Sequence, residues 1–168
     1  MVEFIFTYKL IYKNWKYQLL SALFLFYFVS NNLAQNLVTN GDFENYTSCP
    51  TNYAQVTKAT GWLQPTPGTP DYYHTCSVNL NPNINLAGGE QPYSGNGFAG
   101  IVLSNGTGAY REYIETQLTR TLIANRIYYF EMYVSLGDSS NYASNNFGIY
   151  FSNDSTYSDS TRIAKTPQ

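Results

Sequence analysis

Residues 127–136, with the sequence IYYFEMYVSL, alternate between strongly apolar and more polar side chains. A period of two indicates a β-strand, because successive side chains of an extended backbone point to opposite faces. One parity suits a core and consists of Tyr128, Phe130, Met132, Val134 and Leu136. The other parity suits a wetter surface and consists of Tyr129, Glu131, Tyr133 and Ser135. No stretch of the sequence sustains a convincing helical period of 3.6, so this segment directs the chain toward a β-sheet fold.

Further strands are predicted at residues 97–104, 110–118 and 146–152, together with an opening strand through Leu37 and Val38. Long polar connections separate them, which argues for an antiparallel β-sandwich of the Greek-key or jelly-roll type. About five or six strands can be recognised, whereas a jelly roll has about eight. We therefore expect an all-β sandwich in which either short strands lie hidden among the prolines or the C-terminal part is incomplete.

Four of the prolines, Pro50, Pro65, Pro67 and Pro70, lie between Cys49 and His74. This density excludes a central strand or a long helix there and predicts a long ordered excursion, pinned by Trp62 and by a disulfide. Cys49 and Cys76 are the two cysteines of the chain, and an even count in an exported protein favours a bridge. The alternative is a metal site, which would need more ligands than His74 and has no Cys-x-x-Cys spacing.

The first 34 residues resemble a secretory signal peptide. Lys9, Lys13 and Lys16 precede an uncharged apolar run of 11 residues, and Ala34 supplies the small residue at its exit. A membrane-spanning helix needs roughly 20 apolar residues, which disfavours a permanent anchor. We expect residues 1–34 to be removed and residues 35–168 to form an exported module, either secreted or held at the cell surface. Contact with a membrane is expected only through the signal or through further C-terminal domains.

Composition narrows the range of functions. The chain is sparsely charged, with a formal net charge of −2, and becomes more acidic once the three lysines of the signal are removed. It carries no basic stripe, so a nucleic acid is not an expected partner. Catalysis is not expected either, because His74 is the single histidine and no nucleophile motif is present. Glu112 and Glu115 have opposite parity on one predicted strand and are expected to be solvated surface residues rather than a catalytic pair.

A candidate metal site lies near the start of the module, at Asn40, Asp42 and Glu44. Oxygen ligands of this kind suit calcium, which takes six to eight oxygens. The alternative interpretation is an Asn-Gly turn flanked by two exposed acids. Structural calcium is thus a possible cofactor on these residues, and the sequence indicates no other.

A candidate ligand-binding face follows from the parity of the two clearest strands. Tyr129, Glu131 and Tyr133 are on the outward side of the first, and Tyr150 is on the outward side of the second. Tyrosine rings offer sugars a flat face, and a carboxylate accepts hydrogen bonds from hydroxyl groups. The alternative is that these rings form ordinary cross-strand pairs that stiffen a sheet.

Several stretches together resemble a known kind of module: NLVTNGDFENYTSCP, ATGWLQPTPGTPDYYHTC, SGNGFAGIV, YREYIETQL and YVSLGDSSNYASNNFGIYFS. They are similar to the N-terminal galactose-binding-like jelly-roll module of large exported surface proteins of gliding bacteria. Such proteins often end in a type IX secretion sorting domain, a gliding-motility-associated domain or a peptidoglycan-binding domain. The resemblance implies a carbohydrate-binding-like module, with a polysaccharide or cell-surface glycan as partner. It also implies that a further strand-rich stretch follows, so this chain resembles a truncated member.

Two further functions compete with carbohydrate binding. A purely structural or adhesive surface module explains the same signal, disulfide and β-composition without any small ligand. A glycan hydrolase is the remote alternative, which would need a pair of carboxylates across the sugar.

Overall fold

The computed structural model describes residues 35–83, 88–104, 110–144 and 147–167. Its compact unit spans Leu37–Gln168. The regular elements are one short 3-10 helix, η1 (Val56–Lys58), and four strands: β1 (Trp62–Leu63), β2 (Asp71–His74), β3 (Gly97–Gly100) and β4 (Glu115–Thr116). The described residues contain no helix long and apolar enough to cross a bilayer.

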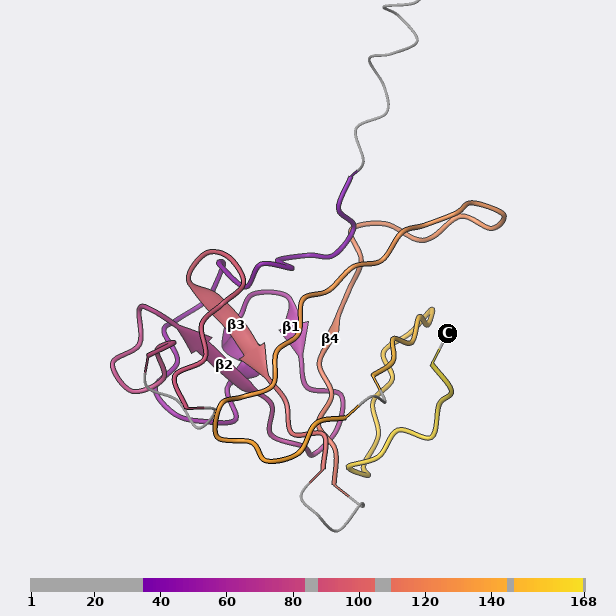
Figure 1. Cartoon of the computed structure of the whole chain (residues 1–168). Helices are drawn as coiled ribbons and strands as arrows, with labels where there is room; N and C mark the ends of the chain where they lie inside the picture. Colours follow the sequence, from indigo (N-terminus) through magenta and orange to yellow (C-terminus); the bar gives the residue numbers. More distant parts are fainter. Residues whose placement is uncertain (1–34, 84–87, 105–109, 145–146, 168) are drawn as a thin grey trace, which may run out of the picture. The chain divides into compact units, whose positions relative to one another are not determined.

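The strands form two small antiparallel sheets, β1–β4 and β2–β3 (Figure 1). In the first, Trp62 is opposite Thr116, and in the second Tyr72 is opposite Ala99. Isolated antiparallel bridges join Val38 to Leu118 and Tyr46 to Ala59. The described chain is therefore β-structured with almost no helix, as predicted, but two two-stranded sheets do not amount to a jelly-roll sandwich.

The core lies in the proline-rich part of the chain and around β2. The largest fully buried side chains all come from these two parts of the chain: Tyr72, Leu80, Val56, Pro50, Pro70 and Pro82. The ring of Tyr73 lies directly over Gly100 of β3, where a Cβ would come within 2.8 Å of the ring carbon Cε2. Because Gly100 has no side chain, the Tyr73 ring of β2 can lie against the backbone of β3.

Trp62 pins the proline-rich excursion, as expected from the sequence. Its Nε1 donates a hydrogen bond to the carbonyl oxygen of Asn40 at 2.8 Å, and its ring stacks on Phe43 with centroids 4.6 Å apart. The indole thereby ties β1 to the turn at the start of the unit. The disulfide between Cys49 and Cys76, whose Cα atoms are 5.7 Å apart, closes the same region.

The predicted core face of residues 127–136 is wrong for the structure described here. This segment forms no strand (Figure 1), and its apolar parity is exposed: Phe130 shows 41% of its surface and Val134 shows 60%. The edge of the Phe130 ring does contact Phe151, at a centroid distance of 6.5 Å. Alternation predicts which side chains favour burial, but burial also requires a partner layer, and these side chains have only partial cover.

We expect Phe130→Ala to lower the free energy of unfolding by less than about 2 kcal/mol. Truncating a fully buried phenylalanine costs about 3–5 kcal/mol, whereas much of this ring is already exposed to water. Denaturant unfolding of both proteins measures the difference. A loss of 3 kcal/mol or more would show that the alternating face is buried in solution, as the sequence pattern alone predicts.

Candidate functional site

The most distinctive surface feature of the described chain combines three tyrosines with one carboxylate. We call it the tyrosine patch and define it as Tyr93, Tyr129, Glu131 and Tyr133. Three of these residues, Tyr129, Glu131 and Tyr133, are at every second position of one segment, the spacing that places side chains on one side of an extended chain. The Tyr129 hydroxyl donates a hydrogen bond to Glu131 Oε2 at 2.8 Å. The structure thus brings together three of the four residues predicted for ligand binding.

Tyr93 joins the patch from a distant loop. Its ring stacks on Tyr133 with centroids 3.5 Å apart and an interplanar angle of 7°. Both rings nevertheless remain open to solvent, with 72% of Tyr93 and 57% of Tyr133 exposed. Tyr129, at 86%, is more exposed still. Sequence reasoning missed Tyr93 because nothing local links residue 93 to residue 133.

The loop that carries Tyr93 is positioned by a close approach at Gly88 and by hydrogen bonds from Gln91. The backbone at Gly88 approaches Asp138 and Ser139 so closely that a Cβ would lie 2.7 Å from the Ser139 hydroxyl oxygen. Gly88 also has a φ of +95°, a conformation that favours glycine. On the other side, the Gln91 side-chain amide donates to the carbonyl oxygens of Pro82 and Gly89, both at 3.2 Å. The loop is therefore tied to the buried Pro82 by Gln91 and lies against Asp138 and Ser139 at Gly88.

Hydrogen bonds keep the patch carboxylate ionised. The hydroxyls of Tyr133 and Tyr129 both hydrogen-bond to Glu131 and lower its pKa below the ordinary glutamate value. The same interactions raise the pKa values of the two phenols, because ionising either would place a second negative charge beside the carboxylate. At neutral pH Glu131 therefore carries a negative charge, and the phenols of Tyr129 and Tyr133 are neutral.

Tyr150, the fourth predicted ligand-binding residue, lies in a different environment. Within the described chain, the ring contact of Tyr150 is with Lys165, whose Nζ lies 5.8 Å from the ring centroid. Nearby, Pro167 packs against Gly148 where a side chain would have no room. The structure does not bring Tyr150 into the tyrosine patch.

The residues predicted as calcium ligands serve other purposes. The Asn40 side chain closes a turn: its Nδ2 donates to the carbonyl oxygens of Asn45 and Thr60, and its Oδ1 accepts from the Asn45 amide. The Asn40 backbone has a φ of 51°, and its carbonyl oxygen accepts a hydrogen bond from the Phe43 amide, so residues 40–43 form a turn. The Glu44 carboxylate accepts hydrogen bonds from the amides of Asn96 and Gly97 and from the Asn96 side chain.

These amide donors direct partial positive charge toward the Glu44 carboxylate. Burial alone would raise the pKa of Glu44, but the hydrogen bonds from Asn96 and Gly97 prevail and lower it. Asp42 is exposed at the rim of the turn. Among the described residues, no group of three or more His, Cys, Asp or Glu side chains lies together as a metal site. Asn40 and Glu44 thus make hydrogen bonds within the protein, and a calcium site on Asn40, Asp42 and Glu44 stays a prediction.

Glu112 is buried, so the prediction that it is a solvated carboxylate on a strand is wrong. It is only 4% exposed, and both carboxylate oxygens accept hydrogen bonds from the protein. Oε1 accepts from the amide and hydroxyl of Thr69 and from the Tyr110 hydroxyl, and Oε2 accepts from the Val102 amide at 2.7 Å. These bonds join three segments of the chain and make Glu112 an internal anchor.

Glu115 also departs from the solvated state that the sequence predicted. Its Oε2 accepts hydrogen bonds from the amide and hydroxyl of Thr156 at 2.9 and 2.7 Å. Burial opposes the charge of Glu115, but hydrogen bonds from Thr156 and Ser155 lower its pKa overall. Glu115 thus ties β4 to the C-terminal segment.

His74 is a core residue at the end of β2. It packs against Tyr46 and Tyr72, with ring centroids 4.7 and 5.9 Å away, and its Nδ1 accepts a hydrogen bond from the Cys76 amide. Its buried Nε2 has no hydrogen-bond partner among the described residues. His74 is thus packed among tyrosines and beside Cys76 at the end of β2.

Comparison of the chain with known protein families, with curated proteins and with solved structures finds no match. The candidate site therefore has to be judged on its own geometry.

Proposed function

We propose that this chain is an exported, non-catalytic surface module that binds carbohydrate through the tyrosine patch. The observation that carries the proposal is the exposed stack of Tyr93 on Tyr133 beside the Tyr129–Glu131 hydrogen bond. Exposed phenol rings offer flat apolar faces on which a sugar ring can lie, and the hydroxyls and the carboxylate supply directional hydrogen bonds. The disulfide supports export, because such bridges persist in oxidising compartments.

An extended ligand suits the patch better than a small molecule. Residues of like parity on an extended backbone are about 6.6–6.8 Å apart, so Tyr129 and Tyr133 lie about two such steps apart. Rings at this separation can engage different units of one polysaccharide chain. A polysaccharide or a cell-surface glycan is therefore the proposed partner.

We expect the double variant Tyr129→Ala/Tyr133→Ala to weaken polysaccharide retention about tenfold or more. An aromatic contact contributes about 1 kcal/mol, so losing two of them costs at least one factor of ten in affinity. Affinity electrophoresis in gels containing a neutral glucan measures the retention. Full retention by the folded double variant would contradict the site.

Tyr157→Ala is the matched control, because Tyr157 is also exposed and hydrogen-bonds to a carboxylate two residues later, Asp159. It should leave retention unchanged, since it lies outside the patch. Equal denaturation midpoints for all variants would show that the differences do not arise from unfolding.

A purely structural or adhesive module is the second candidate function. It is favoured by the row of partly exposed apolar side chains at Phe130, Met132, Val134 and Leu136, which could engage another macromolecule. In that case the wild-type protein would show no retention on any glycan, while turnover of glycans would instead indicate the remote alternative, a hydrolase.

A further inference from the structure

We infer that the tyrosine patch selects glycans that carry free amino groups over neutral and acidic glycans. This inference rests on the proposed carbohydrate-binding function and adds the chemical class of the ligand. The one ionised group of the patch is the carboxylate of Glu131, which accepts hydrogen bonds from two neighbouring phenols.

The position of Glu131 distinguishes it from the other carboxylates described above. Backbone amides donate hydrogen bonds to the carboxylates of Glu112, Glu44 and Glu115, so these three residues link segments within the protein. The partners of Glu131 are instead two side-chain hydroxyls of exposed residues. A carboxylate has about four lone-pair sites, so two phenols leave acceptor capacity for a ligand.

An ammonium group is the ligand group that this arrangement fits best. It donates up to three hydrogen bonds, which the carboxylate can accept with the added strength of opposite charges. The faces of Tyr129 and of the stacked Tyr93–Tyr133 pair attract a cation through their π-electrons. The pyranose ring that bears the amine can meanwhile lie on a phenol face. One amino sugar unit thus uses both features of the patch.

Other sugars use less of the patch or are repelled by it. A neutral sugar keeps the stacking but offers only uncharged hydroxyl donors to Glu131. A uronic acid or sulfated sugar places a negative charge beside Glu131, and the chain as a whole carries a formal net charge of −2. Like charges at short range disfavour binding.

Two forms of the same polymer test the inference: a β-linked glucosamine polysaccharide and its fully N-acetylated derivative. Acetylation removes the positive charge and leaves the sugar backbone in place. At mildly acidic pH and low salt, we expect the wild-type protein to bind the amine form about three- to fivefold more tightly, the size of a cation–aromatic or exposed charge contact. A uronic acid polymer should be retained least.

Glu131→Gln removes the charge and keeps the side-chain shape and hydrogen-bonding capacity. We expect it to lower retention of the amine form more than retention of the acetylated form, so that most of the preference is lost and only the attraction of the phenol faces for the cation remains. Asp159→Asn is the matched control, because Asp159 forms the same kind of pair with Tyr157 outside the patch. It should preserve the preference.

The outcomes separate this inference from the proposed function. Equal retention of both polymers by the wild-type protein would overturn amine selection and leave carbohydrate binding intact. A preference that Asp159→Asn abolishes as fully as Glu131→Gln would also overturn it, since the effect would then be general charge attraction. No retention of any glycan would refute the proposed function itself.

Discussion

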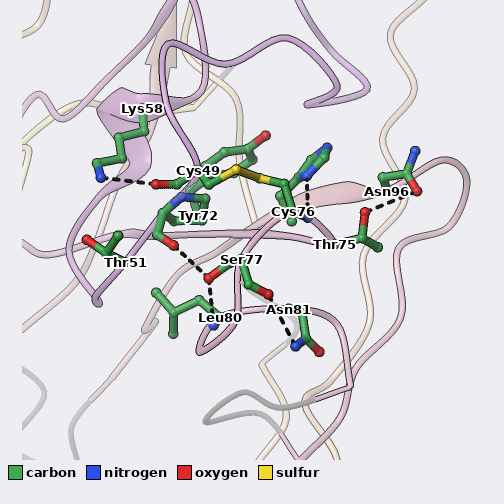
Figure 2. Close-up of a disulfide and its surroundings, with 12 residues drawn as sticks. Cys49, Thr51, Lys58, Tyr72, Thr75, Cys76, Ser77, Leu80, Asn81 and Asn96 are labelled. Atoms are coloured by element: carbon green, nitrogen blue, oxygen red, sulfur yellow. Dashed lines mark hydrogen bonds between the residues drawn. A yellow bond between two sulfur atoms is a disulfide. The ribbon is translucent and has the colours of Figure 1, made fainter.

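Cys76→Ser is expected to lower the free energy of unfolding by about 3–4 kcal/mol. The bridge closes a loop with a sequence separation of 27, and a cross-link of that span restricts the unfolded chain by roughly this amount. Ser77, next to the bridge, holds the two sides of the loop together: its hydroxyl donates to the Pro50 carbonyl oxygen at 2.6 Å and accepts from the Leu80 amide at 2.9 Å (Figure 2). The disulfide therefore secures two of the buried residues of the core, Pro50 and Leu80.

Denaturant unfolding of the wild type and of Cys76→Ser measures this loss. The double variant Cys49→Ser/Cys76→Ser is the control, because it also removes the thiol that the single variant leaves unpaired at Cys49. Both variants should lose a similar amount of stability. A change below 1 kcal/mol would mean that hydrogen bonds such as that from the Lys58 ammonium to the Cys49 carbonyl oxygen hold the loop without the bridge.

Glu112→Ala is expected to lower the free energy of unfolding by about 2–4 kcal/mol. The substitution removes the Glu112 oxygens that accept from the Val102 amide and the Tyr110 hydroxyl, and it leaves the Thr69 amide only its hydrogen bond to the Tyr110 hydroxyl oxygen at 3.2 Å. An unsatisfied buried donor costs about 1–3 kcal/mol. Part of this cost is recovered because water can reach the exposed side of Thr69. Glu112→Gln should cost less, since one side-chain oxygen still accepts while the new amide group faces donors.

A titration distinguishes loss of the charge from general loosening. Burial raises the pKa of Asp71, and the negative charge of Glu112 raises it further. Glu112→Gln should therefore lower the pKa of Asp71, which NMR can follow through its carboxyl carbon. An unchanged Asp71 pKa together with unchanged stability would show that the anchor at Glu112 does not form in solution.

Asp71 gives the stability of the protein a definite pH dependence. Because its folded-state pKa is raised above the unfolded value, its ionisation opposes folding at neutral pH. This penalty disappears as the pH falls through the folded-state pKa. Glu115 acts in the opposite sense, since its lowered pKa contributes stability above the unfolded pKa, and that contribution is lost as the pH falls through the lowered folded-state value.

The sequence by itself determined features that depend on short-range chemistry. Two cysteines in a chain with a signal-like N-terminus predicted a bridge, and the bridge between Cys49 and Cys76 is present. The alternation in residues 127–136 placed Tyr129, Glu131 and Tyr133 on one side, and the hydrogen bond from Tyr129 to Glu131 shows that they are neighbours. Parity can be read from the sequence because it is a property of the extended backbone alone.

The tertiary structure decided which side chains lie in the interior and which distant residues meet. Glu112 is buried because Thr69 and Val102 turn their amides toward it, from 43 and 10 positions away in the sequence. Tyr93 meets Tyr133 only because its loop is held at Gly88 and Gln91. A pattern of apolar residues indicates which side chains favour burial. Whether they are buried depends on which segments pack over them. Such long-range contacts cannot be predicted from local periodicity.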